Sequence, residues 1–439
     1  MSSAVHIVGA GLAGAEAAWQ VAERGLEVVL HEMRPGKLTP AHQGGDFAEL
    51  VCSNSFKSQN LSNASGLLKE ELRRLDSLIM KAAAVAALPA GQALAVDREL
   101  FATQVTEQLR SHPRVTVVAE EVTTLPQQGN EPWVIATGPL TSPALATSLQ
   151  ELAGEPYLYF YDASAPIVTY ESLNTEKVFA ASRYDKGEAD YLNAPLDEAE
   201  YLHFWQELVS AEQHPRHSFE EARFFEGCIP LEEMARRGRE TLAYGPLKPV
   251  GLRDPRSARR PYAVVQLRQD NLRGDLYSLV GFQTNLRFGE QERVFRLIPG
   301  LEEAEFVRFG VMHQNLFINS PALLLPTLQL KGAPHLLFAG QMIGVEGYIE
   351  SAATGWLAGY NAACLAKGVT PRILPEETML GALVHYVTSA EITGFQPMNA
   401  VFGIMPVLIN SIPKISKKLR NQLYAERSLE TLANWVKNV

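Results

Sequence analysis

Cysteine is scarce in this sequence, with only Cys52, Cys228 and Cys364 among 439 residues. So few cysteines, and an odd number of them, exclude a disulfide-stabilised secreted scaffold. No two of the three have the spacing of a structural zinc site. We therefore expect no disulfide framework and no metal site.

The chain also lacks long apolar runs. No stretch of 18 or more apolar residues is present, which excludes an ordinary transmembrane helix. The N-terminus leads directly into an apolar stretch at residues 5–8, without the basic region and cleavage site of a secretory signal peptide. We expect a cytoplasmic protein that has no membrane partner. Its 439 residues, 46% of them hydrophobic, are enough for two globular domains.

Positive charge is limited and unevenly distributed in a chain whose net charge is −10. Residues 236–273 hold ten basic side chains against three acidic ones, and residues 414–437 hold six against two. The net acidity argues against a nucleic-acid partner, whereas the two basic segments are compatible with phosphate binding. A solvated surface is the alternative. In the first segment, Arg256, Arg259 and Arg260 are candidate phosphate contacts.

The N-terminal residues form the clearest motif. Residues 5–8 predict a buried strand, residues 15–24 a helix and residues 27–31 a second strand. Between the first strand and the helix stands the run Gly9-Ala10-Gly11-Leu12-Ala13-Gly14. This arrangement is typical of a Rossmann-like dinucleotide site.

Each part of that run has a physical role in binding a dinucleotide. Gly9 permits the tight turn, Gly11 lets the backbone approach the pyrophosphate, and Gly14 permits close packing of helix on strand. The helix N-terminus offers N–H groups and positive potential to the phosphates. Glu32 follows the second strand, where a carboxylate accepts hydrogen bonds from ribose hydroxyls.

A second glycine-rich segment favours FAD over NAD as the bound dinucleotide. Residues 338–348 resemble the C-terminal FAD motif of flavoproteins whose nucleotide domain is built from two chain segments. The residues of interest there are Gly340, Gly344, Glu346, Gly347 and Tyr348. Two nucleotide-contacting segments so far apart suit FAD, which is long and permanently held.

The remaining pattern predicts an α/β fold with an inserted domain. We expect helices at residues 67–87, 97–109 and 352–367, strands at 115–118 and 134–138, a hairpin of 262–268 with 276–282, and an irregular loop at 39–66. The βα alternation stops near residue 161 and returns near residue 336. We therefore predict an FAD-binding domain of residues 1–160 and 322–439, with an inserted α/β substrate domain of residues 161–321.

The three cysteines differ in their surroundings. Cys228 precedes Pro230, which suits the first turn of a helix, so the helix dipole would stabilise a thiolate there; the nearby Glu232 and Glu233 oppose this. The residues alone fit a structural cysteine as well as a nucleophile. Cys52 lies in a polar loop and is equally open between the two interpretations. Cys364 lies among alanines on an expected helix and is assigned to the core.

With these residues in view, the chain resembles the bacterial folate- and FAD-dependent tRNA (uracil-5-)-methyltransferases, the TrmFO family, over nearly its whole length. One of the specific motifs is Glu226-Gly227-Cys228-Ile229-Pro230. The others are residues 8–14, 31–35, 49–55, 136–142, 191–193, 245–252, 264–268, 281–285, 344–348 and 395–399. Ala194 departs from the pattern, because the family often has cysteine there. That difference implies no essential thiol at this position.

The resemblance implies methylation of the T-loop uridine of tRNA. Methylenetetrahydrofolate supplies the carbon, and NAD(P)H supplies electrons through the flavin. Uracil C5 becomes nucleophilic when a thiolate adds to C6. By resemblance, Cys228 is that thiol and Cys52 is a second active-site thiol that assists proton removal or an intermediate. His313 is the candidate to stack on the pterin of the folate.

Two other readings stay open at this point. GidA-type flavoproteins share the FAD segments and modify wobble uridines, but they are longer, with a helical C-terminal extension that this chain is expected to lack. A plain NAD(P)H oxidase or redox sensor would need no RNA. The Cys228 segment and the basic residues 236–273 argue against it. The sequence leaves open the oligomeric state, the choice of NADH or NADPH and the order of substrate binding.

Overall fold

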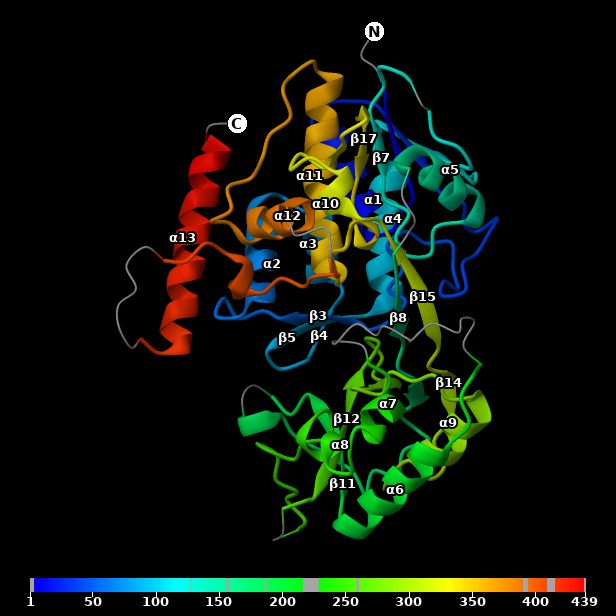
Figure 1. The fold of residues 1–439 in the computed structure, drawn as a ribbon. Coiled ribbons are helices and arrows are strands. Elements are labelled where there is room, and N and C mark those ends of the chain that lie inside the picture. Colours follow the sequence, from blue (N-terminus) through cyan, green and yellow to red (C-terminus); the bar gives the residue numbers. More distant parts are fainter. Residues whose placement is uncertain are drawn as a thin grey trace.

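The computed structural model describes residues 4–126, 128–154, 158–185, 188–215, 229–257, 260–389, 394–408 and 415–437. These residues form two lobes, one above the other in Figure 1, with the N- and C-terminal segments of the chain both in the upper lobe. Nothing in the described part is a helix both long and apolar enough to cross a bilayer.

A six-stranded sheet organises the upper lobe. Its order is β16-β17-β7-β1-β2-β6, and all neighbours are parallel except β16 and β17. The strands are β1 (Val5–Val8), β2 (Val28–His31), β6 (Val115–Val118), β7 (Trp133–Ile135), β16 (Gln329–Leu330) and β17 (Ala333–Phe338). Apolar residues of its central strands, Ile7 and Leu30 among them, are fully buried, as expected of a sheet covered on both faces. Strands from both ends of the chain thus share one sheet.

Two helices distant in sequence pack tightly beside this sheet. These are α1 (Leu12–Glu23) and α11 (Tyr348–Ala366). A Cβ atom added to Gly355 would lie 2.2 Å from the carbonyl oxygen of Ala13, and one added to Gly14 would lie 1.8 Å from that of Gly9. Only glycine permits these approaches, so the two segments form a single body.

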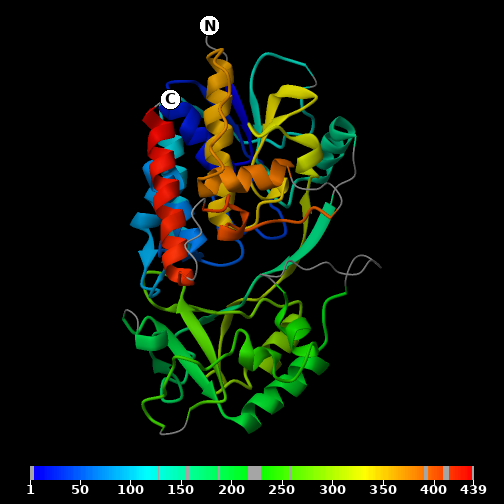
Figure 2. The same ribbon diagram turned by 60° about the vertical axis from the view of Figure 1, so that its left-hand side comes forward.

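Further elements complete the upper lobe. The helices are α2 (Ala64–Arg74), α3 (Leu78–Val85), α4 (Arg98–Ser111), α5 (Pro143–Ala153), α10 (Ser320–Leu323), α12 (Met379–Ser389) and α13 (Lys417–Lys437). A small sheet joins β3 (Ser55–Ser58), β5 (Ala93–Val96) and β4 (Ala87–Leu88) in that order. In Figure 2, α13 runs along the outside of this lobe.

The lower lobe has its own sheet and core. The sheet order is β10-β11-β12-β13-β9-β14, from β9 (Ile167–Thr169), β10 (Phe179–Ala180), β11 (Tyr191–Leu196), β12 (Ala263–Gln269), β13 (Leu276–Leu279) and β14 (Phe306–Arg308). Helices α6 (Glu198–Ser210), α7 (Leu231–Arg236), α8 (Thr241–Tyr244) and α9 (Phe288–Phe295) belong to it. Buried residues such as Phe204, Phe282 and Phe295 form a core separate from the upper one.

An antiparallel ribbon connects the lobes. It consists of β8 (Leu158–Ala163) and β15 (Met312–Phe317), which pair from Leu158 with Phe317 to Ala163 with Met312. Figure 1 shows these strands running from one lobe to the other. The α/β fold with an inserted α/β unit agrees with the sequence analysis. The exact domain limits at residues 160 and 321 stay a prediction.

Several predicted elements differ in extent. The single helix expected over 67–87 is two helices, α2 and α3, because the chain turns at Asp76 (φ 61°) and Ser77 caps α3 by accepting from the Met80 N–H at 3.2 Å. The loop expected over 39–66 contains β3 and the start of α2. Helices α1 and α11 begin three and four residues earlier than expected, at Leu12 and Tyr348. Both helices begin within or directly after a glycine-rich segment, where the periodicity is weak.

A buried carboxylate ties α12 and α13 to α2. Glu71 accepts hydrogen bonds from the main-chain N–H groups of Met379 at 2.6 Å and Leu380 at 2.9 Å, and from the Ser428 hydroxyl. Glu71 therefore accepts hydrogen bonds from main-chain N–H groups that have no partner within the first turn of α12, and it also binds a side chain of α13. Burial raises the pKa of Glu71 to about 7, although these hydrogen bonds act in the opposite direction.

Glu71 should give the protein a measurable pH dependence of stability. The folded state holds this proton up to a pH of about 7, whereas the unfolded chain releases it near the ordinary pKa of 4.5. Stability therefore falls as pH rises from 4.5 to 7, by on the order of 3 kcal/mol. Glu71→Gln should flatten this slope in denaturant titrations at several pH values. Glu70→Gln, on the partly exposed side of the same helix, should leave it in place; an unchanged slope in Glu71→Gln would contradict the assignment.

Candidate functional site

A cavity of about 420 Å³ opens where the parallel strands of the upper sheet end. Its walls include Val8 and Gly9 after β1, Glu32 after β2, Thr137 after β7 and Gly340 after β17. The carboxyl edge of a parallel sheet is the usual ligand site of such folds. The volume lies in the ordinary range of small-molecule and cofactor pockets.

The glycine-rich turn after β1 forms one wall of this cavity. The Gly9 N–H donates to His31 O at 2.8 Å, which continues the pairing of β1 with β2 up to the turn. Gly11 is the N-cap of α1, and no side chain caps the helix there. A Cβ atom on Gly11 would meet nothing within 4 Å, so open space lies beside the helix N-terminus. This geometry is compatible with the predicted pyrophosphate site, which stays a prediction.

The predicted cofactor residues divide into two groups. Those that line the cavity are Gly9, Gly11, Leu12, Ala13, Glu32, Gly340, Glu346, Gly347 and Tyr348. Ala10, Gly14 and Gly344 lie behind that lining. Ala10 donates its N–H to Glu32, Gly14 packs on Gly9, and Gly344 packs against the ring of Phe395.

Glu32 is held in place by two neighbours. Its Oε2 accepts from the Ala10 N–H at 2.7 Å, and its Oε1 lies 3.0 Å from the Arg34 Nε. Burial alone would raise the pKa of Glu32, but the Arg34 guanidinium outweighs it and holds this pKa below its ordinary value. An ionised carboxylate is thus available at the position where the sequence analysis expects ribose hydroxyls.

Gly11→Val should yield folded but colourless protein. The Cβ atom of the valine would stand in the open space beside the start of α1, with no other group within 4 Å, so we expect the fold to be retained while FAD is excluded. Absorbance near the flavin bands and thermal unfolding measure the two properties separately. Gly129→Val, in a surface segment with equally open space, is the control and should stay yellow. Normal flavin content in Gly11→Val would refute the assignment of this turn.

Cys52 lies at the edge of the same cavity. Its main-chain N–H and that of Ser53 both donate to the Tyr348 hydroxyl, at 2.9 and 3.0 Å. Its thiol donates to Ala163 O at 3.5 Å. Tyr348 begins α11 and Ala163 ends β8, so this thiol is placed by three segments far apart in sequence.

The surroundings of Cys52 favour the neutral thiol. Burial raises its pKa far above the ordinary value, and the negative charge of Asp162 raises it further, followed by that of Glu346. Glu346 itself has a strongly raised pKa because of burial and Asp162, although Gln341 donates to it at 2.6 Å. The cavity thus brings together a thiol and two carboxyl groups with closely linked protonation.

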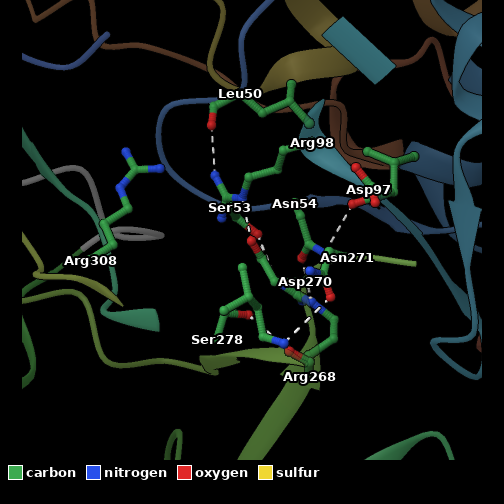
Figure 3. A network of polar contacts seen from close by, with 12 residues as sticks. Leu50, Ser53, Asn54, Asp97, Arg98, Arg268, Asp270, Asn271, Ser278 and Arg308 are labelled. Atoms are coloured by element: carbon green, nitrogen blue, oxygen red, sulfur yellow. Dashed lines mark hydrogen bonds and ion pairs between the residues drawn. The ribbon is translucent and has the colours of Figure 1, made fainter. Parts of the chain in front are cut away.

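Three arginines hold the loop that carries Cys52. Arg98 donates to the carbonyl oxygens of Leu50 at 2.6 Å and Cys52 at 3.2 Å. Arg268 donates to Asn54 Oδ1 at 2.8 Å and Ser53 Oγ at 2.9 Å, and Arg308 donates to Val51 O. Figure 3 shows these side chains converging on the loop from both lobes. Sequence reasoning missed all three, because their partners are 46 to 257 residues away and no local pattern marks them.

The remaining predicted site residues are described only in part. Cys228 and Arg259 lie outside the described residues; Pro230, two positions after Cys228, is the N-cap of α7 as expected. His313 lies on β15 and pairs with Asp162 of β8. Asp162 is one of the residues that line the cavity. Cys364 is buried on α11, which confirms the core assignment.

Arg256 and Arg260 lie on the lower lobe, along a separate cavity of about 1000 Å³. All five N–H groups of Arg256 are used within the protein. They donate to both oxygens of Asp254 and to the carbonyl oxygens of Glu176, Lys177 and Val178. Arg256 therefore organises its own loop, and Arg260 is the better placed of the two for an outside phosphate.

Comparisons with known proteins bear on this site. The family model described as Glucose inhibited division protein A matches residues 4–370. Methylenetetrahydrofolate--tRNA-(uracil-5-)-methyltransferase TrmFO of Desulforudis audaxviator (strain MP104C) is 59% identical over 436 residues, 99% of each chain. The protein of that name from Moorella thermoacetica is 60% identical over 430 residues, 98% of each chain.

Among solved structures, Aquifex aeolicus GidA in its form II crystal superposes with a TM-score of 0.70. The match covers 100% of this chain and 76% of that one, at 16% identity. At this identity the likeness shows the fold alone. It is a mixed α/β fold shared with a GidA protein, in agreement with the fold class expected from the sequence.

Proposed function

The chain belongs to the TrmFO family of methylenetetrahydrofolate--tRNA-(uracil-5-)-methyltransferases, and we propose on that basis that it methylates C5 of the T-loop uridine of tRNA. The observation that carries the proposal is identity of 59% over 99% of the chain. The cavity at the sheet edge, with Cys52 at its rim, agrees with it.

The residues of the cavity fit FAD. Gly11 leaves open space before an uncapped helix N-terminus, and Glu32 presents an ionised carboxylate after β2. On the opposite wall, Gly340, Gly347 and Tyr348 come from the second segment of the nucleotide domain. When bound, FAD supplies the two electrons that convert the folate-derived carbon to a methyl group.

In this proposal the chain itself supplies two thiols. Cys228 adds as thiolate to uracil C6, which makes C5 nucleophilic, and it leaves again when the C5 proton has been removed. Cys52, neutral and hydrogen-bonded to Ala163 O, exchanges a proton beside the reacting carbon. The carboxyl groups of Asp162 and Glu346, whose charges act on this thiol, are the proposed partners for that proton.

Substrate binding extends the same proposal. The pterin of methylenetetrahydrofolate stacks near His313, on the ribbon strand that faces Asp162. Arg259 and Arg260 contact tRNA phosphates from the lower lobe, with Arg256 holding their loop. NAD(P)H is the source of electrons.

The test is incubation of FAD-loaded protein with unmodified tRNA, methylenetetrahydrofolate and NAD(P)H, followed by nucleoside analysis. We expect 5-methyluridine in the T loop, and none when the folate is left out. A modified wobble uridine would instead indicate the activity of a GidA-type enzyme. Consumption of NAD(P)H without any modified nucleoside would favour a plain flavin oxidase.

A further inference from the structure

Three arginines lie beside the Cys52 loop, and in the described part of the chain only one of them is paired with a carboxylate. The guanidinium groups of Arg98, Arg268 and Arg308 donate hydrogen bonds to residues 50–54. Arg98 Nε forms an ion pair with Asp270 Oδ2 at 2.8 Å, whereas Arg268 and Arg308 form no ion pair among the described residues. A guanidinium group without an ion pair is costly in such surroundings.

The three arginines differ in how many of their guanidinium nitrogens donate hydrogen bonds. Arg98 uses its Nε and both of its terminal nitrogens, and Arg268 uses Nε and Nη2 on side-chain oxygens of the loop. Arg308 has one hydrogen bond among the described residues, from Nη2 to Val51 O. Its Nε and Nη1 therefore keep their N–H groups for another acceptor.

Arg308 is also placed at the mouth of the site. It ends β14, which is the edge strand of the lower sheet, and its side chain is half-buried. Val51, whose carbonyl it holds, lines the flavin cavity together with Cys52 and Ser53. Figure 3 shows the Arg308 side chain apart from the Arg98–Arg268 cluster, on the other side of the loop. Burial lowers the pKa of Arg308 and the charge of Arg98 lowers it further, whereas Asp270 acts in the opposite direction.

We propose that Arg308 binds one phosphodiester of the RNA strand, next to the nucleotide that enters the flavin cavity. A planar guanidinium with free N–H groups on adjacent nitrogens matches two phosphate oxygens. A nucleotide inserted beside Cys52 brings its flanking phosphates to the cavity rim, where Arg308 has one hydrogen bond among the described residues and N–H groups left for a phosphate. This inference rests on the proposed function, because it needs a polynucleotide substrate.

The test compares tRNA binding by FAD-loaded wild-type protein, Arg308→Gln and Arg308→Lys over a series of salt concentrations. Arg308→Gln keeps an N–H donor for Val51 O but loses the charge. It should weaken binding by about tenfold and lower the salt slope by up to about one unit. Arg308→Lys should retain most of the slope. Arg287→Gln, which removes an exposed guanidinium of the same lobe that is paired with Glu212, is the matched control.

A second measurement changes the RNA and compares the wild-type protein with Arg308→Gln. A tRNA with a neutral methylphosphonate linkage beside the target uridine should lose about the same affinity, and Arg308→Gln should add little to that loss. An unchanged salt slope with Arg308→Gln, or a raised KM for methylenetetrahydrofolate in place of weaker tRNA binding, overturns the assignment. Absence of 5-methyluridine from the wild-type reaction would count against the proposed function instead. Methylation with an unchanged slope would count against Arg308 alone.

Discussion

Cys228→Ala should reduce tRNA methylation by more than about 10³-fold while leaving FAD bound. Uracil C5 has little nucleophilicity until a thiolate adds to C6, and no hydroxyl or water at neutral pH replaces a thiolate well. The flavin should be unaffected, because most residues of the cavity that fits FAD belong to the two terminal segments. Nucleoside analysis measures the first effect and the visible spectrum the second.

Two further measurements make this prediction specific. Transfer RNA with 5-fluorouridine at the target should form a covalent adduct with the wild-type protein, because fluorine at C5 does not leave as a proton does. Cys228→Ala should form none. Cys364→Ala is the control and should behave as wild type, because that thiol is buried on α11 away from the cavity. Substantial methylation by Cys228→Ala would remove this residue from the nucleophile role.

The nucleotide half of the site was predictable because its signals are local. A strand, a glycine run and a helix stand consecutively in residues 5–23, and their geometry follows from the allowed backbone conformations of glycine. Glu32 follows from the next strand end by the same reasoning. The return of the chain at β17 and α11 was predictable as well, because residues 338–348 repeat the pattern of strand, glycine turn and helix.

The surroundings of Cys52 were not predictable in this way. Asp162, Arg268 and Arg308 reach the loop from strands more than 100 residues away, and no local pattern in the sequence links any of them to Cys52. The polar character of residues 52–55 left Cys52 open between a reactive and a structural thiol. The fold places this half-buried residue at the edge of the cavity and gives its thiol a carbonyl acceptor. Long-range packing, which no local pattern encodes, decides that difference.

Cys52→Ala should also lower methylation sharply, by about 10²-fold or more, but through a different step. The Cys52 thiol donates to Ala163 O at 3.5 Å, and burial with the charge of Asp162 keeps its pKa above the ordinary value. A thiol in this state is protonated at neutral pH and does not attack C6. It is suited to exchanging a proton with the substrate beside Asp162 and Glu346, and alanine removes that exchange.

Covalent trapping separates this role from that of Cys228. If Cys52 handles a proton, Cys52→Ala still adds its remaining active-site thiol to the uracil, so the adduct with 5-fluorouridine should form while normal turnover fails. Cys52→Ser, which keeps a donor for Ala163 O, should recover part of the lost rate, because the hydroxyl preserves the hydrogen bond and a proton. Mass spectrometry of the trapped peptide gives the decisive result. RNA attached to Cys52, together with an adduct that survives in Cys228→Ala, would reverse the two roles, since the thiol in the cavity would then have to ionise against both its burial and its carboxyl neighbours.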